Sequence, residues 1–98
     1  ANLYKSSLVG ANLSHCQGIN VNFSHADLSN ANLTWANLTA ANLSRSNLTN
    51  VNLAGANLEG ANLDHSRIWN TSLTMLRLSG AIRVIKKLTN KVSRAASK

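Results

Sequence analysis

The sequence is short of the residues that usually cross-link, break or anchor a chain. It contains no proline, a single cysteine and only four aromatic residues among 98. The lone Cys16 excludes an intrachain disulfide framework and leaves no cysteine pair for a metal. No apolar run approaches the roughly 18 residues of a membrane span, and the amino end does not have the pattern of a signal peptide. These absences leave the compartment open, and the cytoplasm is the expected one.

Acidic residues are scarce as well, with three against ten lysines and arginines, for a net charge of +7. Residues 1–80 hold four basic and three acidic residues, which leaves +1. Residues 81–98 hold six basic residues and no acidic one, which gives +6. The basic character therefore belongs to the end of the chain and not to its body.

A period of five residues governs residues 1–80. The central position of sixteen consecutive pentads is leucine thirteen times, and Gly18, Phe23 and Ile68 are the exceptions. The residue two places earlier is small, and the residue between them is asparagine ten times and aspartate once. Five steps along an α-helix turn by about 500°, and a straight strand alternates its faces, so neither element aligns these leucines. Self-similarity at a fixed period indicates a solenoid whose stacked repeats share one core.

Seven pentads carry the motif most clearly, because each begins with Ala-Asn-Leu or Ala-Asp-Leu. They start at Ala11, Ala26, Ala31, Ala36, Ala41, Ala56 and Ala61. These residues resemble the A(N/D)LXX repeat of the pentapeptide-repeat family, which has many bacterial and cyanobacterial members without a known activity. The resemblance covers about four-fifths of the chain. It implies an all-β solenoid, a right-handed quadrilateral β-helix with four pentads to a coil and the central and small residues pointing inward.

With four pentads to a coil, residues twenty apart stack, and residues 1–80 form about four coils. The core columns are then Leu3–Phe23–Leu43–Leu63, Leu8–Leu28–Leu48–Ile68, Leu13–Leu33–Leu53–Leu73 and Gly18–Leu38–Leu58–Leu78. Gly18 leaves a hole at the start of its column. A local register adjustment that turns Ile19 inward is one way to fill it. Cys16 is expected to be buried as a small hydrophobic residue.

The pentad pattern ends after Gly80, because Arg83 stands where a leucine is due. Residues 81–98 place their apolar side chains on one arc of a helical wheel and their basic ones opposite, which predicts an amphipathic α-helix with Ser79 as its N-cap. The chain thus divides into a repeat domain, 1–80, and a basic helix, 81–98. The helix has three candidate roles: a cap over the end of the solenoid, a self-association element, or an anchor on nucleic acid or anionic lipid.

The sequence offers no catalytic or metal-binding constellation. His25 and His65 share a column two coils apart, about 9.6 Å at the usual strand spacing, which is too far for one zinc ion. Lys5 and Arg45 complete that column as a weakly basic stripe, and His15 lies on another face. The serines and threonines follow the leucines in a solvent-facing row, without a carboxylate–histidine partner. We expect no enzyme, no cofactor, no metal and no small-molecule substrate.

Two tryptophans occupy outward positions. Trp35 shares a column with Gly55, so its ring is expected to lie over the bare glycine. Because aromatic residues are enriched in interface cores, Trp35 and Trp69 are candidate contacts for a partner, although each ring has the alternative of packing on its own wall. The tail adds five basic candidates: Arg83, Lys86, Lys87, Lys91 and Arg94.

These features favour a non-enzymatic structural or protein-interaction module, which binds another protein or associates with itself through a solenoid end. The alternative is an electrostatic binder of nucleic acid or an anionic surface through residues 81–98. The family resemblance raises a third role, since some members mimic duplex DNA and protect gyrase from quinolones. Those members are long acidic rods, whereas this chain is short and basic. The start at Ala1, in repeat phase and without methionine, is compatible with one segment of a longer repeat protein.

Overall fold

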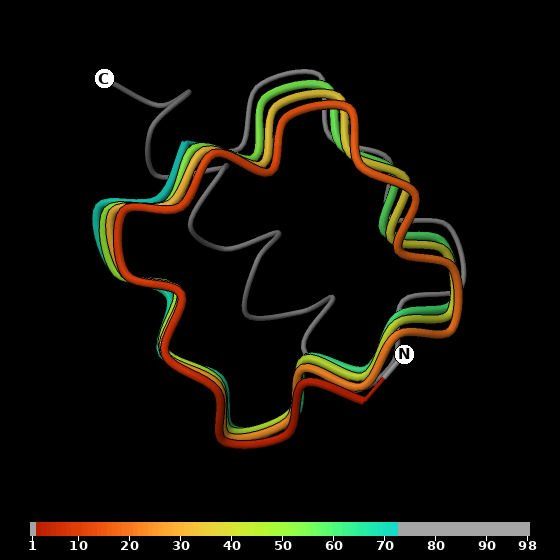
Figure 1. Ribbon diagram of the computed structural model, residues 1–98, viewed down its shortest axis with the longest axis horizontal. Helices are drawn as coiled ribbons and strands as arrows, with labels where there is room; N and C mark the ends of the chain where they lie inside the picture. The colour runs from red at the N-terminus through yellow and green to blue at the C-terminus, as the bar shows by residue number, and fades with distance from the viewer. Residues whose placement is uncertain (1, 73–98) are drawn as a thin grey trace, which may run out of the picture.

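The chain winds into a square β-helix. A computed structural model describes residues 2–72. Residues twenty apart are joined by parallel bridges, from Asn2↔Asn22 to Asn52↔Ser72. Viewed down the axis, each coil traces a square with one pentad per side, and the chain runs clockwise as it recedes from the N-terminal coil (Figure 1). The predicted right-handed quadrilateral β-helix is therefore confirmed for these residues.

The described residues form three complete coils, 2–61, and the start of a fourth, 62–72. Each side makes its strand contact through single bridging residues, and the described range holds no longer strand. The rest of the expected fourth coil lies outside the described residues. So do the boundary at residue 80, the Ser79 cap and the expected helix 81–98.

The coils are joined by a repeated set of backbone hydrogen bonds. Asn32 shows the pattern: its N–H donates to the Ala11 carbonyl of the preceding coil at 2.9 Å, and its carbonyl accepts from the Leu13 N–H at 2.7 Å. The bridging residue thus directs both polar backbone groups toward the coil before it. A third bond per side joins the corners, as from the His15 N–H to the Thr34 carbonyl at 2.9 Å.

Each side ends in a tight turn. The Ala36 N–H donates to the Leu33 carbonyl at 3.1 Å, which closes a four-residue turn. Its third residue, Trp35, has φ +60°, and the corresponding corner residues of the described pentads all have φ between 52° and 73°. A positive φ at the third position alone is the type II pattern.

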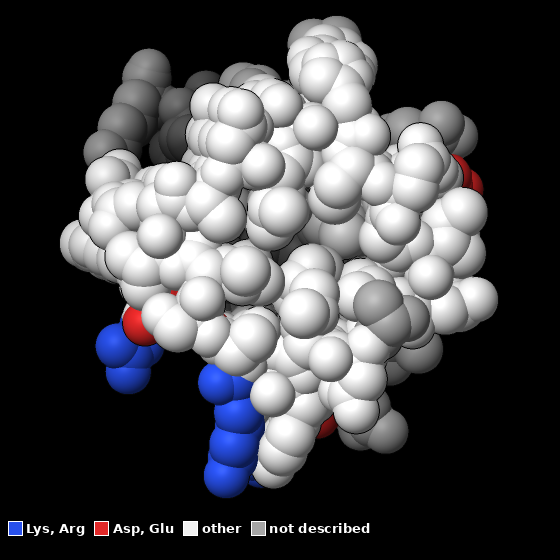
Figure 2. Space-filling model, in the orientation of Figure 1, with Lys and Arg blue, Asp and Glu red and all other residues white. Residues whose placement is uncertain are grey.

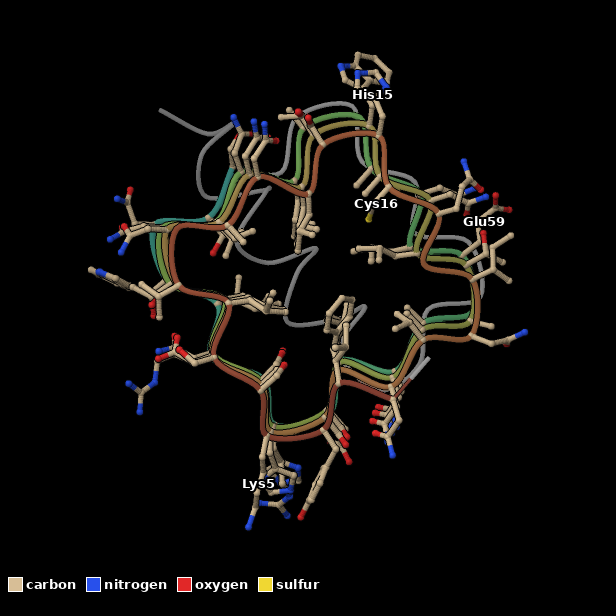
Figure 3. The ribbon with its side chains drawn as sticks, in the orientation of Figure 1. Lys5, His15, Cys16 and Glu59 are labelled. Atoms are coloured by element: carbon tan, nitrogen blue, oxygen red, sulfur yellow. The ribbon has the colours of Figure 1, made fainter. Side chains whose placement is uncertain are left out.

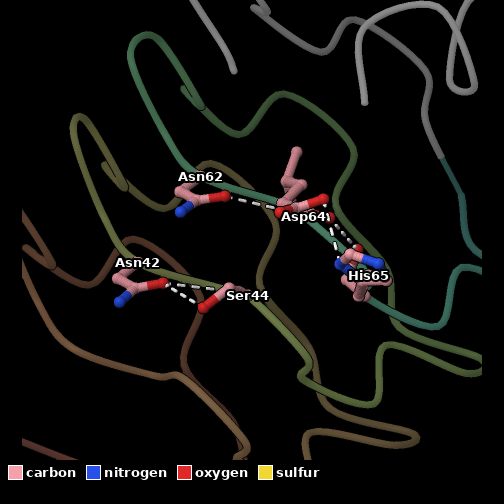
Figure 4. Close-up of polar contacts among 7 residues, drawn as sticks. Asn42, Ser44, Asn62, Asp64 and His65 are labelled. Carbon is pink, nitrogen blue, oxygen red and sulfur yellow. Dashed lines mark hydrogen bonds and ion pairs between the residues drawn. The ribbon is translucent and has the colours of Figure 1, made fainter. Parts of the chain in front are cut away.

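The asparagine that precedes each core leucine holds this turn in place. Asn42 Oδ1 accepts from the Ser44 N–H at 3.0 Å and from the Ser44 hydroxyl at 2.6 Å (Figure 4). Asn62 repeats the backbone bond with the Asp64 N–H at 2.9 Å. These asparagines point outward, as the pattern predicts, but they are structural turn residues and not merely solvated ones.

The core lies on the axis of the solenoid and is most complete in its second and third coils. Leu28, Leu33, Leu38, Leu43 and Leu48 are fully buried. In the first coil Leu3, Leu8 and Leu13 are only partly buried and pack against that core. The inward assignment of the central residue is therefore confirmed, with a gradient of burial along the axis.

Two expectations about the first coil need correction. Ile19 does not turn inward: it is 52% exposed, and the register continues through the Gln17↔Asn37 bridge. The space beside Gly18 is already filled, because a Cβ built there would lie 2.8 Å from Leu38 Cδ2 and 3.3 Å from Val21 Cγ1. Turning Ile19 inward would also break the bond from the Gly18 N–H to the Asn37 carbonyl.

Cys16 packs against the core but is only half-buried. The expectation of a buried small hydrophobic residue is thus only partly right. Desolvation by its neighbours raises the pKa of the Cys16 thiol, although a hydrogen bond from its own backbone N–H opposes that rise. The thiol form is therefore favoured at neutral pH.

Candidate interaction surfaces

Trp35 lies flat against the wall of the solenoid. A Cβ built on Gly55 would lie 2.5 Å from Trp35 Cδ2 and Cε3, so the indole occupies the space that any other residue would need. This contact agrees with the predicted column of His15, Trp35 and Gly55. The ring is still 51% exposed, since its outer side faces away from the wall.

Trp69 projects further than Trp35 and is 68% exposed. It follows the inward Ile68, which itself follows the exposed Arg67. The alternation sends Arg67 and Trp69 outward from the same side of the fourth coil. We call Arg67, Trp69 and the neighbouring Asn70 the Trp69 surface. The Asn70 amide donates to Asn50 Oδ1 at 2.6 Å and so ties this surface to the coil before it.

A basic column runs along one corner of the solenoid, as the sequence predicts. It contains Lys5, His25, Arg45 and His65, which are all exposed and stack at one corner because residues twenty apart are aligned; Lys5 points away from the body (Figure 3). Lys5 Nζ lies 5.5 Å from the centroid of the Tyr4 ring, and that ring meets His25 edge-on with the centroids 5.4 Å apart. His65 Nδ1 lies 3.1 Å from Asp64 Oδ1 (Figure 4). His65 is exposed and Asp64 is partly exposed, so this pair contributes little to stability.

Asp27 is the one carboxylate among the bridging residues. Its Oδ1 accepts from the Ser29 N–H at 3.0 Å, in the place where other pentads use asparagine. The hydrogen bonds from the Ser29 backbone and hydroxyl lower the pKa of Asp27, and the charge of Arg67 lowers it further. Across residues 2–72, three cationic residues balance three acidic ones, so this part of the chain is neutral.

Among residues 2–72 no group of three or more histidine, cysteine, aspartate or glutamate side chains is placed to hold a metal ion. In the same range no helix has the length and apolar character needed to cross a membrane. The five basic candidates of the tail lie outside the described residues.

The repeat pattern and the square coil point to one family. The family described as pentapeptide repeats matches the chain with 8 copies, over residues 1–34, 31–70 and 47–82. The chain belongs to the pentapeptide-repeat family. A search of curated proteins found no match.

Solved structures of other pentapeptide-repeat proteins share the fold. The chain is similar to Rfr23 from the cyanobacterium Cyanothece 51142, with 40% identity and a TM-score of 0.78 over 79% of this chain and 52% of that one. It is also similar to alr5209 from Nostoc PCC 7120, with 34% identity and a TM-score of 0.77 over 79% of this chain and 64% of that one. The chain thus spans between about half and two thirds of the length of these relatives.

A more distant relative extends the fold beyond cyanobacteria. AT2G44920, a pentapeptide-repeat protein from the Arabidopsis thaliana thylakoid lumen, shares 24% identity over 90% of this chain and 69% of that one, with a TM-score of 0.52. At that identity the likeness supports the fold alone.

The pentapeptide-repeat solenoid places its candidate residues on separate walls. Trp35 lies at the corner that His15 labels in Figure 3, whereas Trp69 belongs to the side formed by residues 66–70. Arg67 was not among the residues that the sequence singled out as candidates. The signal for it was present, because two outward positions flank each inward residue and a tryptophan occupied one of them.

Proposed function

We propose that this pentapeptide-repeat chain is a non-catalytic protein-interaction module. The observation that carries the proposal is the Trp69 surface. The side walls of the second and third coils consist mostly of asparagine, serine and threonine, whereas here a tryptophan and an arginine project from adjacent outward positions. Tryptophan and arginine are among the residues most enriched at the energetic centres of protein interfaces.

The surrounding wall suits this role. Its backbone is bonded coil to coil, as from the Asn50 N–H to the Trp69 carbonyl at 2.9 Å, so the backbone that carries the indole is held before any partner arrives. A rigid anchor loses little conformational entropy on binding. Trp35 is a poorer anchor, because one side of its ring is already used against Gly55.

The test is affinity capture from the source cell with the 98-residue chain, compared with Trp69→Ala and with Thr49→Ala. Thr49 occupies the same wall position one coil earlier, so its replacement is the matched control. We expect at least one protein that Thr49→Ala retains and Trp69→Ala loses. A capture profile that is unchanged by Trp69→Ala would contradict the proposal.

A second candidate function rests on the charge distribution. Residues 2–72 are neutral, so the net charge of +7 arises from residues 73–98. Concentrated basic charge supports salt-dependent binding to nucleic acid or an anionic membrane surface. If the tail binds duplex DNA, affinity should fall steeply with salt and vanish when residues 83–98 are removed. Equal binding by the full and shortened chains would exclude this role.

A further inference from the structure

All three lysine and arginine residues that the structure describes lie on or beside one corner of the solenoid. Lys5 and Arg45 belong to the corner column, and Arg67 follows the last member of that column by two residues. His25 and His65 complete the column. Figure 2 shows the lysine and arginine atoms gathered in the lower part of the view. We call these five residues the basic corner.

The charges at this corner differ in how far they project from the protein. All five members of the basic corner are exposed, whereas Asp27 and Asp64 beside it are only partly exposed. The Asp27 carboxylate accepts from the Ser29 N–H at 3.0 Å, and the Asp64 carboxylate lies 3.1 Å from His65 Nδ1. Within the described part of the chain, neither the lysine nor the arginine of the column forms an ion pair with a carboxylate. The corner therefore presents positive charge outward, and the nearby carboxylates are held by residues of the solenoid itself.

The positive charges form a line along the axis of the solenoid. Residues twenty apart stack coil on coil at about 4.8 Å, so the three steps from the coil of Lys5 to the coil of Arg67 cover about 14 Å. In the second and third coils, the outward residues on either side of the corner are asparagine, serine and threonine, with Asp27 as the one exception. A line of charge with neutral walls beside it suits a linear ligand, whereas a flat membrane surface would meet it only along one ridge.

We propose that the partner bound at the Trp69 surface is a protein that lays an extended acidic segment along the basic corner. This inference rests on the proposed function, because it names the chemistry of the partner. Arg67 belongs both to the basic corner and to the Trp69 surface, so a segment that follows the corner arrives beside the exposed Trp69 indole. Complementary charge would then position the segment, and the indole would provide its apolar contact.

An extended segment has dimensions that suit this line of charge. It rises about 3.3 Å per residue, so side chains on one of its faces recur about every 6.6 Å. Three acidic residues at alternate positions therefore span about 13 Å, which is close to the length of the basic corner. Lysine and arginine have long, flexible stems, so their charged heads can reach carboxylates without an exact match of spacing.

The same corner is a poorer fit for a nucleic acid. A nucleic-acid strand carries a negative charge on every nucleotide. The partly exposed carboxylates of Asp27 and Asp64 lie beside the line of positive charge and would repel such a strand. A peptide can place uncharged residues at those points, so the charge pattern favours the acidic segment.

The test measures binding of a short synthetic peptide to the 98-residue chain by fluorescence anisotropy. The peptide alternates glutamate with threonine, and a copy with glutamine in place of each glutamate is the uncharged control. Lys5→Gln/Arg45→Gln removes two positive charges from the corner. Lys86→Gln/Lys87→Gln removes two positive charges from the tail and is the matched control, because both variants lower the net charge equally.

We expect the corner variant to raise the Kd of the acidic peptide about fivefold or more, and the tail variant to raise it less than about twofold. Binding should weaken as salt is added, and the glutamine peptide should not bind. The variant Lys5→Arg/Arg45→Lys keeps both charges and should keep the wild-type Kd. Equal losses from the corner and tail variants would overturn the proposal. So would a thymidine oligonucleotide that binds the corner more tightly than the peptide does.

Imidazole NMR signals of the wild-type chain provide a second readout that needs no variant. His25 and His65 belong to the basic corner, whereas His15 lies at another corner (Figure 3). Adding the acidic peptide should shift the signals of His25 and His65 and leave that of His15 in place. Shifts of equal size at all three histidines, or at none of them, would overturn the proposal.

Failure of the acidic segment is distinguishable from failure of the Trp69 surface. The peptide measurements probe the corner, whereas the capture experiment compares Trp69→Ala with Thr49→Ala. If Trp69→Ala loses a captured protein and the acidic peptide does not bind the corner, the interaction module stands and the acidic segment is rejected. If the peptide binds the corner and capture is indifferent to Trp69→Ala, the Trp69 surface is rejected instead.

Discussion

At the scale of single residues, the corners impose the strictest backbone requirement. Every described corner residue has a positive φ, although eleven of them are not glycine. An L-residue with a Cβ disfavours this conformation by roughly 1–2 kcal/mol, and asparagine tolerates it best. The corner column Asn30, Asn50 and Asn70 fits that preference, whereas Trp35 and Arg45 do not. The stacked hydrogen bonds on either side of each corner enforce the conformation regardless of its residue.

Gly55 and Gly60 are two corner glycines that differ chiefly in whether an indole ring covers them. Their φ values are 73° and 71°, but only Gly55 has an indole over it. Gly60→Ala should cost about 1 kcal/mol from backbone conformation alone, since its new Cβ meets only ordinary contacts at 3.8 Å. Gly55→Ala should cost more and displace the Trp35 ring.

Chemical denaturation measures the loss of stability in each variant. Tryptophan fluorescence in a Trp69→Phe background reports how exposed the Trp35 ring is to solvent. Trp35 emission should shift to the red in Gly55→Ala and stay unchanged in Gly60→Ala. If both variants lose the same stability and keep the same emission, the ring does not pack on Gly55 in solution.

Asp27 yields a prediction about pH. Its folded pKa is lowered, chiefly by the Ser29 backbone N–H, so its ionised form stabilises the fold. That contribution is complete above the unfolded pKa of about 3.9 and is lost as the pH falls through the folded value. The variant Asp27→Asn keeps the acceptor without the titration.

Melting temperatures of both proteins between neutral and acidic pH provide the measurement. The difference between them should be constant above about pH 5 and should shift against the wild type below about pH 4. Because the two chains are identical at every other position, the difference isolates Asp27. A difference that is flat down to about pH 2 would show that Asp27 gains nothing from these bonds.

At the scale of the element, each pentad combines a bridging strand residue, a turn that is hydrogen-bonded to the asparagine side chain, and a corner. Leu53→Ala should cost on the order of 2–5 kcal/mol, because Leu53 is buried between neighbouring coils. Asn52→Ala should cost about 0.5–1.5 kcal/mol, because Asn52 accepts a single bond from the Ala54 N–H.

The asparagines differ in how many hydrogen bonds their side chains accept, which allows their contributions to stability to be compared. Asn47 accepts from both the N–H and the hydroxyl of Thr49, so Asn47→Ala should cost more than Asn52→Ala. Urea denaturation ranks the three variants. Equal losses from Asn52→Ala and Leu53→Ala would contradict the inward and outward assignment.

The sequence pattern was sufficient to predict the square coil, because the turn and the inward residues of each pentad are determined by residues within that pentad. The period of five, the small residue and the leucine predict the square coil and the core columns. The pattern indicated an outward turn position for the asparagine but not the hydrogen bond it makes, because a solvated residue and a bonded turn residue have the same sequence. It also failed at Gly18, where Leu38 leans into the vacant space from the next coil. That adjustment depends on side-chain packing between residues twenty apart.

At the scale of the whole molecule, each coil contacts only its neighbours along the axis. Stability in such proteins is approximately a sum of coil and interface terms, and terminal coils contribute less. The sequence showed where the repeats run, but not which wall binds a partner. Trp35 occupies a corner and Trp69 the position after a core residue, and the extent of the contact between the Trp35 ring and Gly55 cannot be read from the sequence.

The third core column allows the same leucine-to-alanine substitution to be made in three successive coils, which tests whether a terminal coil contributes less to stability. Leu13 is partly buried in the first coil, whereas Leu33 and Leu53 are buried in the second and third. Leu33→Ala and Leu53→Ala should each cost on the order of 2–5 kcal/mol, and Leu13→Ala less than about 2 kcal/mol, because its site loses less burial and opens to solvent instead of leaving a closed cavity. Urea denaturation of the three variants measures these costs. Equal losses from Leu13→Ala and Leu33→Ala would contradict the gradient of burial along the axis.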